Sequence, residues 1–144
     1  MATRSRIAIE KKGVDGTPIV ESIYCHWDGY PSNNGRLLLE NYQDREKVEK
    51  LIALGDISFL AEEGEPSGPH SFENPQGGVV VAYHRDRGEA LRAPRSNHSR
   101  QGFVRSDVEE YGYLFTLEGE WLFVDGHKGA STREAIPLKG VVKS

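Results

Sequence analysis

Residues 111–124 read YGYLFTLEGEWLFV, with two runs of aromatic and aliphatic residues on either side of a Glu118-Gly119 turn. Aromatic and β-branched residues favour strands, and a glycine in a short turn supplies the positive φ that joins antiparallel strands. The stretch therefore predicts a β-hairpin. Side chains alternate along a strand, so Trp121 and Phe123 are expected to share one face.

The N-terminal part of the chain contains a second hairpin pattern. Apolar and polar residues alternate over residues 4–10 and again over 19–27, and the glycine-containing stretch 13–16 separates the two runs. A period of two places Cys25 and Trp27 on the apolar face of the second run. We expect this face to point toward the core.

Further along the chain, helical and strand patterns alternate. Apolar residues recur at helix spacing over 36–54, with a break at Asp44, and they predict two helices. Residues 79–84 form a continuous apolar run, which is typical of a central strand covered on both faces. Ser106 and Glu109 match a capping box, so a short helical turn is expected to begin there.

These patterns predict an α+β fold with a mainly antiparallel sheet and one or two helices packed on one face. The length of 144 residues fits one core, and we assign residues 1–125 to a single domain. Residues 126–144 form a tail that is expected to be an edge strand or disordered. Loops with little regular structure are expected over 62–77 and 90–101, which are rich in Gly, Pro, Ser and charged residues.

Composition and charge exclude several classes of protein. Hydrophobic residues make up 37% of the chain and charged residues 28%, close to the average of soluble domains. The net charge of −4 argues against a surface that follows nucleic-acid phosphates, so nucleic acid is not an expected partner. No run approaches the ~20 apolar residues that cross a bilayer, and the first residues lack a signal-peptide core. The single cysteine, Cys25, lies in an apolar run and favours a reducing, cytoplasmic setting.

Several short strings carry a resemblance to a known set of proteins. They are IYCHWDGYP at residues 23–31, LGDIS at 54–58, HRDRGE at 84–89 and EYGYLF at 110–115. In these strings the chain resembles a widespread set of small proteins encoded by phages and prophages. The resemblance implies a phage origin and a bacterial host cytoplasm, and it implies no particular reaction.

The first string contains candidate ligand-binding residues. His26 and Asp28 lie on the same strand face, where an imidazole and a carboxylate two residues apart converge and can hold a ligand or a metal. Trp27 or Tyr30 can stack on a planar group. In the alternative, structural interpretation, His26 satisfies a loop carbonyl, Asp28 bonds to the turn at Gly29, and Tyr30 covers the edge of the core.

The HRDRGE string follows the expected strand 79–84, at a point where polar groups can line a pocket. Arg85 and Arg87 can grip a phosphate with paired hydrogen bonds. Alternatively, the string forms an exposed ion-pair network without function. Residues 85–105 contain six arginines, a local excess of positive charge. This excess suits an anionic ligand or an acidic partner; alternatively, the arginines are solvated and bind nothing.

A zinc site built from His26, Asp28, His84 and Asp86 is chemically permitted, but no Cys-x-x-Cys or His-Glu-x-x-His motif accompanies these residues. Gly-x-Ser-x-Gly and phosphate-binding glycine loops are also missing. We therefore expect no catalytic residues, no metal and no cofactor. The sequence favours binding over catalysis.

These observations lead to one hypothesis with two alternatives. The hypothesis is a phage accessory protein that binds an anionic small molecule, such as a nucleotide signal of host defence. The alternatives are an inhibitor of a bacterial host enzyme or defence complex and a metal-dependent hydrolase, and a homo-oligomer stays open. The expected ligand-binding residues are His26, Trp27, Asp28, Tyr30, His84, Arg85, Asp86 and Arg87.

Overall fold

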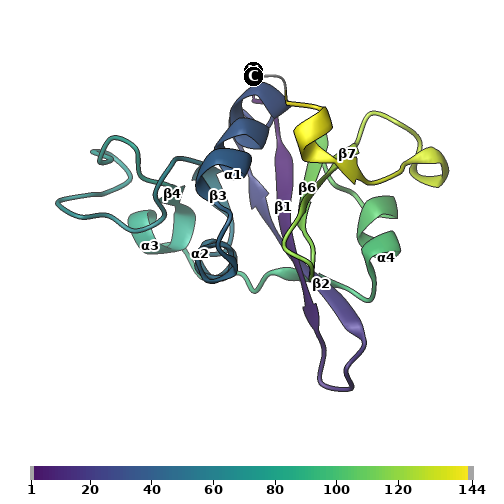
Figure 1. The fold of residues 1–144 in the computed structure, drawn as a ribbon. Helices are drawn as coiled ribbons and strands as arrows, with labels where there is room; N and C mark the ends of the chain where they lie inside the picture. The colour runs from purple at the N-terminus through teal and green to yellow at the C-terminus, as the bar shows by residue number, and fades with distance from the viewer. Residues whose placement is uncertain (1, 143–144) are drawn as a thin grey trace.

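The computed structural model describes residues 2–142, which form an α+β fold around an eight-stranded mixed sheet (Figure 1). The strands are β1 (Ser5–Lys12), β2 (Pro18–Cys25), β3 (Ile57–Phe59), β4 (Val81–Ala82), β5 (Arg95–Asn97), β6 (Tyr111–Phe115), β7 (Trp121–Asp125) and β8 (Ile136–Pro137). The helices are α1 (Arg36–Asn41), α2 (Arg45–Ala53), α3 (Tyr83–Arg87) and α4 (Arg100–Arg105), with single turns η1 (Pro31–Gly35), η2 (Ala130–Thr132) and η3 (Leu138–Gly140). The predicted α+β class is confirmed.

The sheet has the order β4-β3-β2-β1-β6-β7-β8, and β5 lies beside β2. Both predicted hairpins are present: Ile7 pairs with Ile23 in the first and Tyr113 with Phe123 in the second. β1 and β6 join the two hairpins in parallel, and β2 and β3 are also parallel. The sheet is therefore mostly antiparallel, with two parallel pairings.

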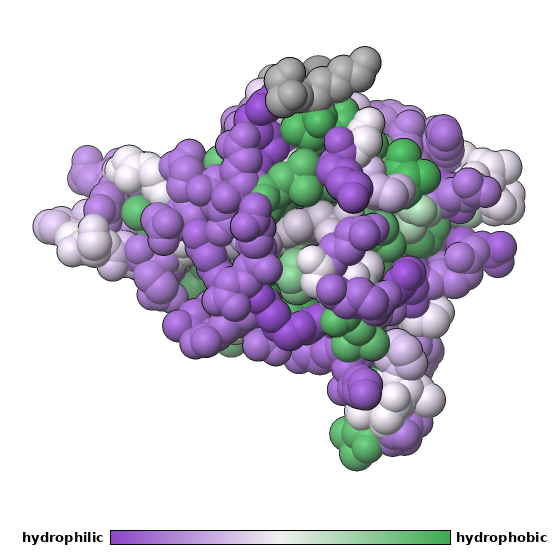
Figure 2. Space-filling view, viewed as in Figure 1, coloured by the Kyte–Doolittle hydropathy of each residue, from purple (hydrophilic) through white to green (hydrophobic). Residues whose placement is uncertain are grey.

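Each face of the sheet has its own core. The first packs Ile7, Ile9, Tyr113 and other residues against α1 and α2, as predicted for these helices. The outer sides of these helices are polar, and hydrophilic side chains cover them in the space-filling view (Figure 2). On the other face, Phe103 from α4 packs with Ala8 and other residues. This second layer was not predicted: no helix was expected over Arg100–Arg105, of which only the first two residues fall in the loop predicted over 90–101.

Two further sequence predictions are wrong. Residues 79–84 do not form a central strand, because only Val81–Ala82 pair with β3, at the edge of the sheet, and α3 begins at Tyr83. The carboxylate of Asp86 accepts the amide hydrogen of Ala82 and stabilises the start of that helix. Ser106 follows the end of α4 instead of starting a helix, and its hydroxyl donates to the Phe103 carbonyl (2.6 Å).

The tail, assigned to residues 126–144, contributes to the sheet and to the first core. Ile136–Pro137 form the edge strand β8, which pairs with β7, and Leu138 is buried. The last two residues of that assignment, 143–144, lie outside the described residues. Among residues 2–142 no helix is long and apolar enough to cross a membrane.

Close packing explains the glycine of the HWDGYP string. Gly29 donates its N–H to the Thr3 carbonyl (2.8 Å), and its own carbonyl accepts the Tyr113 hydroxyl (2.6 Å). A Cβ at this position would lie 2.7 Å from Cβ of Ser5. Beside it, the Asp28 backbone has a positive φ of 56°, and its carbonyl accepts from the side-chain amide of Asn33. This part of the string therefore holds the start of β1 against the loop.

Gly29→Ala is expected to lower the free energy of unfolding by about 2 kcal/mol, because the added methyl group overpacks a site closed by backbone and by Ser5. Urea unfolding followed by circular dichroism measures the change. Gly77→Ala is the matched control, since a Cβ there meets nothing within 4 Å. Equal stabilities for the two variants would contradict the packing argument.

Candidate ligand-binding cavity

A cavity of about 200 Å³ lies where β2, β3 and α3 meet the chain segment that precedes β5. Cys25, Ile57 and Ala82 pair with one another across β2, β3 and β4 and belong to the first core. The residues next to them in the chain, Tyr24, Asp56 and Tyr83, line the cavity. The lining residues are Tyr24, Leu54, Asp56, Tyr83, His84, Glu89, Ala90, Leu91 and Arg92.

Asp56 fixes both tyrosines of the cavity. Its carboxylate oxygen Oδ1 accepts the backbone N–H of Tyr24 at 3.0 Å, and its carbonyl accepts the backbone N–H of Tyr83 at 3.3 Å. Asp56, the residue before β3, thus ties together the backbones of two tyrosines that are 59 positions apart in the chain. The inner wall of the cavity is thus anchored to the sheet through Tyr24, whereas residues 89–92 of the irregular segment before β5 form the outer wall.

The outer wall of the cavity depends on Gly55, which follows α2. Its φ of +77° is left-handed, a conformation that glycine adopts without strain, and a Cβ there would lie 3.0 Å from Cδ1 of Leu91. Leu91 therefore packs directly over the backbone at the end of the helix. Its side chain remains 53% exposed, so the cavity has an apolar rim that a ligand can reach.

The first predicted string reaches the cavity through Tyr24. The Tyr24 hydroxyl lies 2.7 Å from Nδ1 of His26, which fixes the phenol ring, and the His26 ring meets Trp27 edge to face at 4.8 Å. Trp27, Asp28 and Tyr30 are exposed and do not line this cavity. Of the four residues of this string that were expected to bind a ligand, His26 contacts the cavity residue Tyr24, and Trp27, Asp28 and Tyr30 face solvent.

The second predicted string reaches the cavity through His84. Nδ1 of this residue lies 2.6 Å from the Glu89 carbonyl, which makes Nδ1 the protonated nitrogen and leaves Nε2 as an acceptor in the neutral ring. Arg87 lies over the Phe72 ring at 4.8 Å and pairs with Glu89 at 3.3 Å. The two strings therefore meet around one cavity, but Tyr24 and His84 bring them there instead of Asp28 and Arg87.

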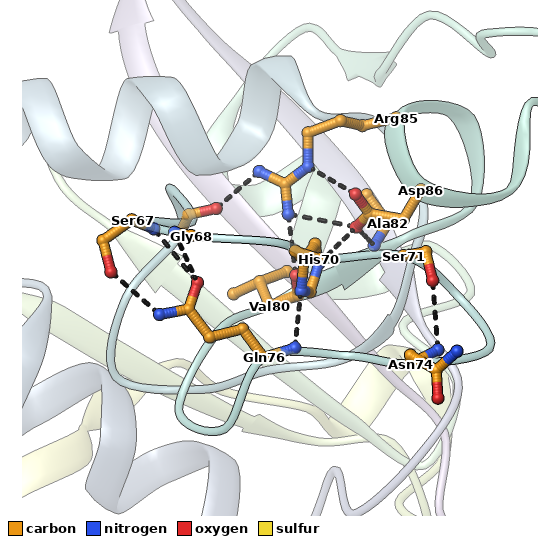
Figure 3. A network of polar contacts seen from close by, with 11 residues as sticks. Ser67, Gly68, His70, Ser71, Asn74, Gln76, Val80, Ala82, Arg85 and Asp86 are labelled. Atoms are coloured by element: carbon orange, nitrogen blue, oxygen red, sulfur yellow. Dashed lines mark hydrogen bonds and ion pairs between the residues drawn. The ribbon is translucent and has the colours of Figure 1, made fainter.

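Arg85 and Asp86 belong to an internal polar network that sequence reasoning missed (Figure 3). The Arg85 guanidinium donates to the carbonyls of Gly64 and Val80 and to the Asp86 carboxylate. His70 lies with its Nε2 at 3.1 Å from the same carboxylate. These contacts hold the excursion 62–77, which has little regular structure, as predicted, against α3.

The protonation states in this network follow from its hydrogen bonds. Nδ1 of His70 accepts the backbone N–H of Gln76 at 2.9 Å, and Nε2 lies 3.1 Å from the Asp86 carboxylate. Burial raises the pKa of Asp86, but hydrogen bonds from Arg85, the Ala82 amide and His70 outweigh burial and hold this pKa below its ordinary value. Asp86 is therefore an ionised, enclosed carboxylate.

The cavity offers both donors and acceptors to a ligand. Burial raises the pKa of the Tyr24 and Tyr83 phenols, which stay protonated. The side chains of Asp56 and Glu89 supply carboxylates, and Arg92 supplies a guanidinium. Aromatic rings, an apolar rim and a few converging polar groups are the usual features of a small-molecule site.

Within residues 2–142, no group of three or more His, Cys, Asp and Glu side chains is arranged to hold a metal ion. The four residues considered for zinc are divided: Asp86 is enclosed with His70, whereas His26 contacts Tyr24. Burial raises the pKa of the Cys25 thiol to about 11, so this residue stays protonated near neutral pH.

A scan against protein-family models, a search of curated proteins and a search of solved structures gave no match to this chain. The cavity and the groups that line it are therefore the features from which a function can be inferred.

Proposed function

We propose that the protein is an accessory binding protein that takes up a nucleotide-like small molecule in the cavity between Tyr24 and Tyr83 and does not transform it. One observation carries this proposal: Asp56, the residue before β3, bonds to the backbone amides of Tyr24 and Tyr83, whose side chains line a cavity together with carboxylates and a guanidinium. Aromatic rings held in this way provide stacking surfaces for a base.

Each lining group has a role in this proposal. A cavity of about 200 Å³ is smaller than the ~300–1,000 Å³ of sites for drug-sized ligands, so it encloses a ring system while the rest of the ligand extends outward. Asp56 and Glu89 accept hydrogen bonds from amino or hydroxyl groups. Arg92 attracts negative charge on the ligand. The phage origin implied by the HWDGYP resemblance fits a ligand that is a nucleotide signal of host defence.

The test combines mass spectrometry of ligands released from the purified protein with thermal shift against ribonucleotides, cyclic nucleotides and nucleosides. A ligand at about 100 times its Kd should raise the melting temperature by several degrees. Tyr83→Ala is expected to weaken binding at least about tenfold through the loss of stacking. Tyr30→Ala, which removes an exposed tyrosine outside the cavity, is the control. The proposal fails if no ligand is released and no compound shifts the transition.

The exposed aromatic residues of the first string favour a second candidate, an inhibitor of a host protein. Trp27 is 42% exposed and Tyr30 39% exposed, and both residue types are enriched where protein interfaces gain most of their binding energy. In a pull-down from host lysate, this candidate expects one stoichiometric protein that Trp27→Ala releases and Tyr83→Ala retains. The small-molecule proposal expects no such protein.

A further inference from the structure

Two arginines lie beside Tyr24 on the sheet face that carries the cavity. In the antiparallel register of β1 and β2, Arg6 is directly opposite Tyr24, and in that of β2 and β5, Arg95 is directly opposite Ser22. Residues directly opposite on antiparallel strands share a face, with Cβ atoms about 5 Å apart. Ser22 and Tyr24 share a face because they are two positions apart, so both guanidiniums originate next to the cavity wall.

Both guanidiniums have only uncharged hydrogen-bond partners. Arg6 donates from Nε to the Ser22 hydroxyl and from a terminal nitrogen to the Ser22 carbonyl, both at 2.9 Å. Arg95 donates to the Ser106 hydroxyl at 2.9 Å, and its Nε is buried without a hydrogen-bond partner. Among residues 2–142, neither forms an ion pair with a carboxylate. A partly buried guanidinium with an unsatisfied donor is rare in proteins and costly to keep.

The charge of Arg95 also acts on Arg6. Burial is the larger cause that lowers the pKa of Arg6, and the positive charge of Arg95 lowers it further. Burial likewise lowers the pKa of Arg95. Like charges brought together in this way raise the local positive potential, which an anion relieves.

The acidic groups in the neighbourhood have other partners. Asp56 accepts the Tyr24 amide hydrogen, Asp107 accepts the Glu109 amide hydrogen at 2.9 Å, and the Glu109 carboxylate lies 3.8 Å from Arg4. These carboxylates moderate the charge of the arginines without pairing with them. The positive charges of Arg6 and Arg95 therefore lack a paired carboxylate, and the Nε of Arg95 lacks an acceptor.

We propose that Arg6 and Arg95 together bind the phosphate group of the molecule whose ring occupies the cavity, an inference that rests on the proposed function. The planar guanidinium fork matches phosphate oxygens with paired, charge-assisted hydrogen bonds. The direct pairing of Arg6 with Tyr24 places the phosphate next to the stacked ring. The arginines that hold phosphate are then Arg6 and Arg95, and not Arg85 and Arg87, whose contacts lie within α3 and the excursion.

The experiment compares a ribonucleoside monophosphate with the matching nucleoside by isothermal titration, using the base that wild type prefers. Arg95→Gln is expected to lower the affinity for the monophosphate about tenfold or more and to leave the nucleoside within about twofold, because only the phosphate contact is lost. Arg95→Lys keeps the positive charge but loses the planar guanidinium, and its affinity for the monophosphate should lie between those of wild type and Arg95→Gln. Arg105→Gln, on the exposed side of α4, is the matched control.

The possible outcomes separate this inference from the proposed function. If neither compound binds wild type, the cavity proposal fails and the phosphate site fails with it. If both bind equally well, or if Arg95→Gln weakens both to the same extent, the cavity proposal stands and the phosphate site is wrong. The ligand-free Arg95→Gln variant should melt close to wild type, since the buried Nε that it removes has no partner and the hydrogen bond to the uncharged Ser106 hydroxyl contributes little to stability. Arg6→Gln then serves as a second variant.

Discussion

Asp86→Ala is expected to lower the free energy of unfolding by about 3 kcal/mol, because it leaves the Arg85 guanidinium without its carboxylate partner. The Asp86 side chain is only 4% exposed, so water does not replace the lost contacts. The carboxylate also accepts the Ala82 amide hydrogen (2.8 Å) at the start of α3. Arg85 is 23% exposed, which places the expected loss at the lower end of the range for broken buried ion pairs.

Urea unfolding measures the loss, and amide hydrogen exchange shows where it acts. Faster exchange is expected over residues 62–80, because Asp86 joins this excursion to α3 through Arg85 and His70. Arg87→Ala is the control on the same helix: its ion pair with Glu89 is exposed, and the expected loss is less than about 1 kcal/mol. If Asp86→Ala costs no more than Arg87→Ala, the network does not stabilise the fold.

The stability that the Asp86 carboxylate contributes is also expected to depend on pH. Its pKa is lowered from an ordinary value of 3.8 in the folded protein, so the stability it contributes is complete above the unfolded pKa and is lost as pH falls through the folded pKa. The difference in the free energy of unfolding between wild type and Asp86→Asn should therefore be constant near neutral pH and shrink below about pH 4. Glu10, whose pKa is also lowered, titrates in both proteins and cancels in the difference.

Local patterns predicted the two hairpins, because strand-forming residues lie next to the turns that join them. They also placed the break between α1 and α2 at Asp44. Where the sequence predicted wrongly, the outcome depended on partners distant in the chain. Residues 79–82 are buried as their hydrophobicity indicated, yet β3 is only three residues long and offers β4 a short edge to pair with.

The candidate site was predictable only in part for the same reason. Tyr24 and His84 lie in the strings singled out by the sequence, and they do reach a common cavity. Asp56 was not predicted, because its role depends on a contact with a strand 32 residues earlier. His70 gave no signal at all, since a single histidine in a Gly, Pro and Ser rich segment has no distinctive spacing. Contacts of this kind come from the fold and not from local pattern.

The last prediction concerns Phe103 of α4, whose side chain lies in the second core. Its ring is fully buried against the sheet face opposite α1 and α2, in a cluster with Ala8 and Leu114. A helix of six residues does not form on its own, so α4 depends on this packing. Phe103→Ala is expected to lower the free energy of unfolding by about 4 kcal/mol, through lost burial and the cavity left behind.

Two further variants make the Phe103 prediction specific to packing. Phe103→Leu keeps most of the volume and should cost only about 1 kcal/mol in urea unfolding. Gln101→Ala, on the exposed side of the same helix, should stay within about 0.5 kcal/mol of wild type. Because Ser106 ends α4 and holds Arg95, loosening the helix should also weaken phosphate binding. A Phe103→Ala variant as stable as Gln101→Ala would mean that α4 is not anchored through this ring.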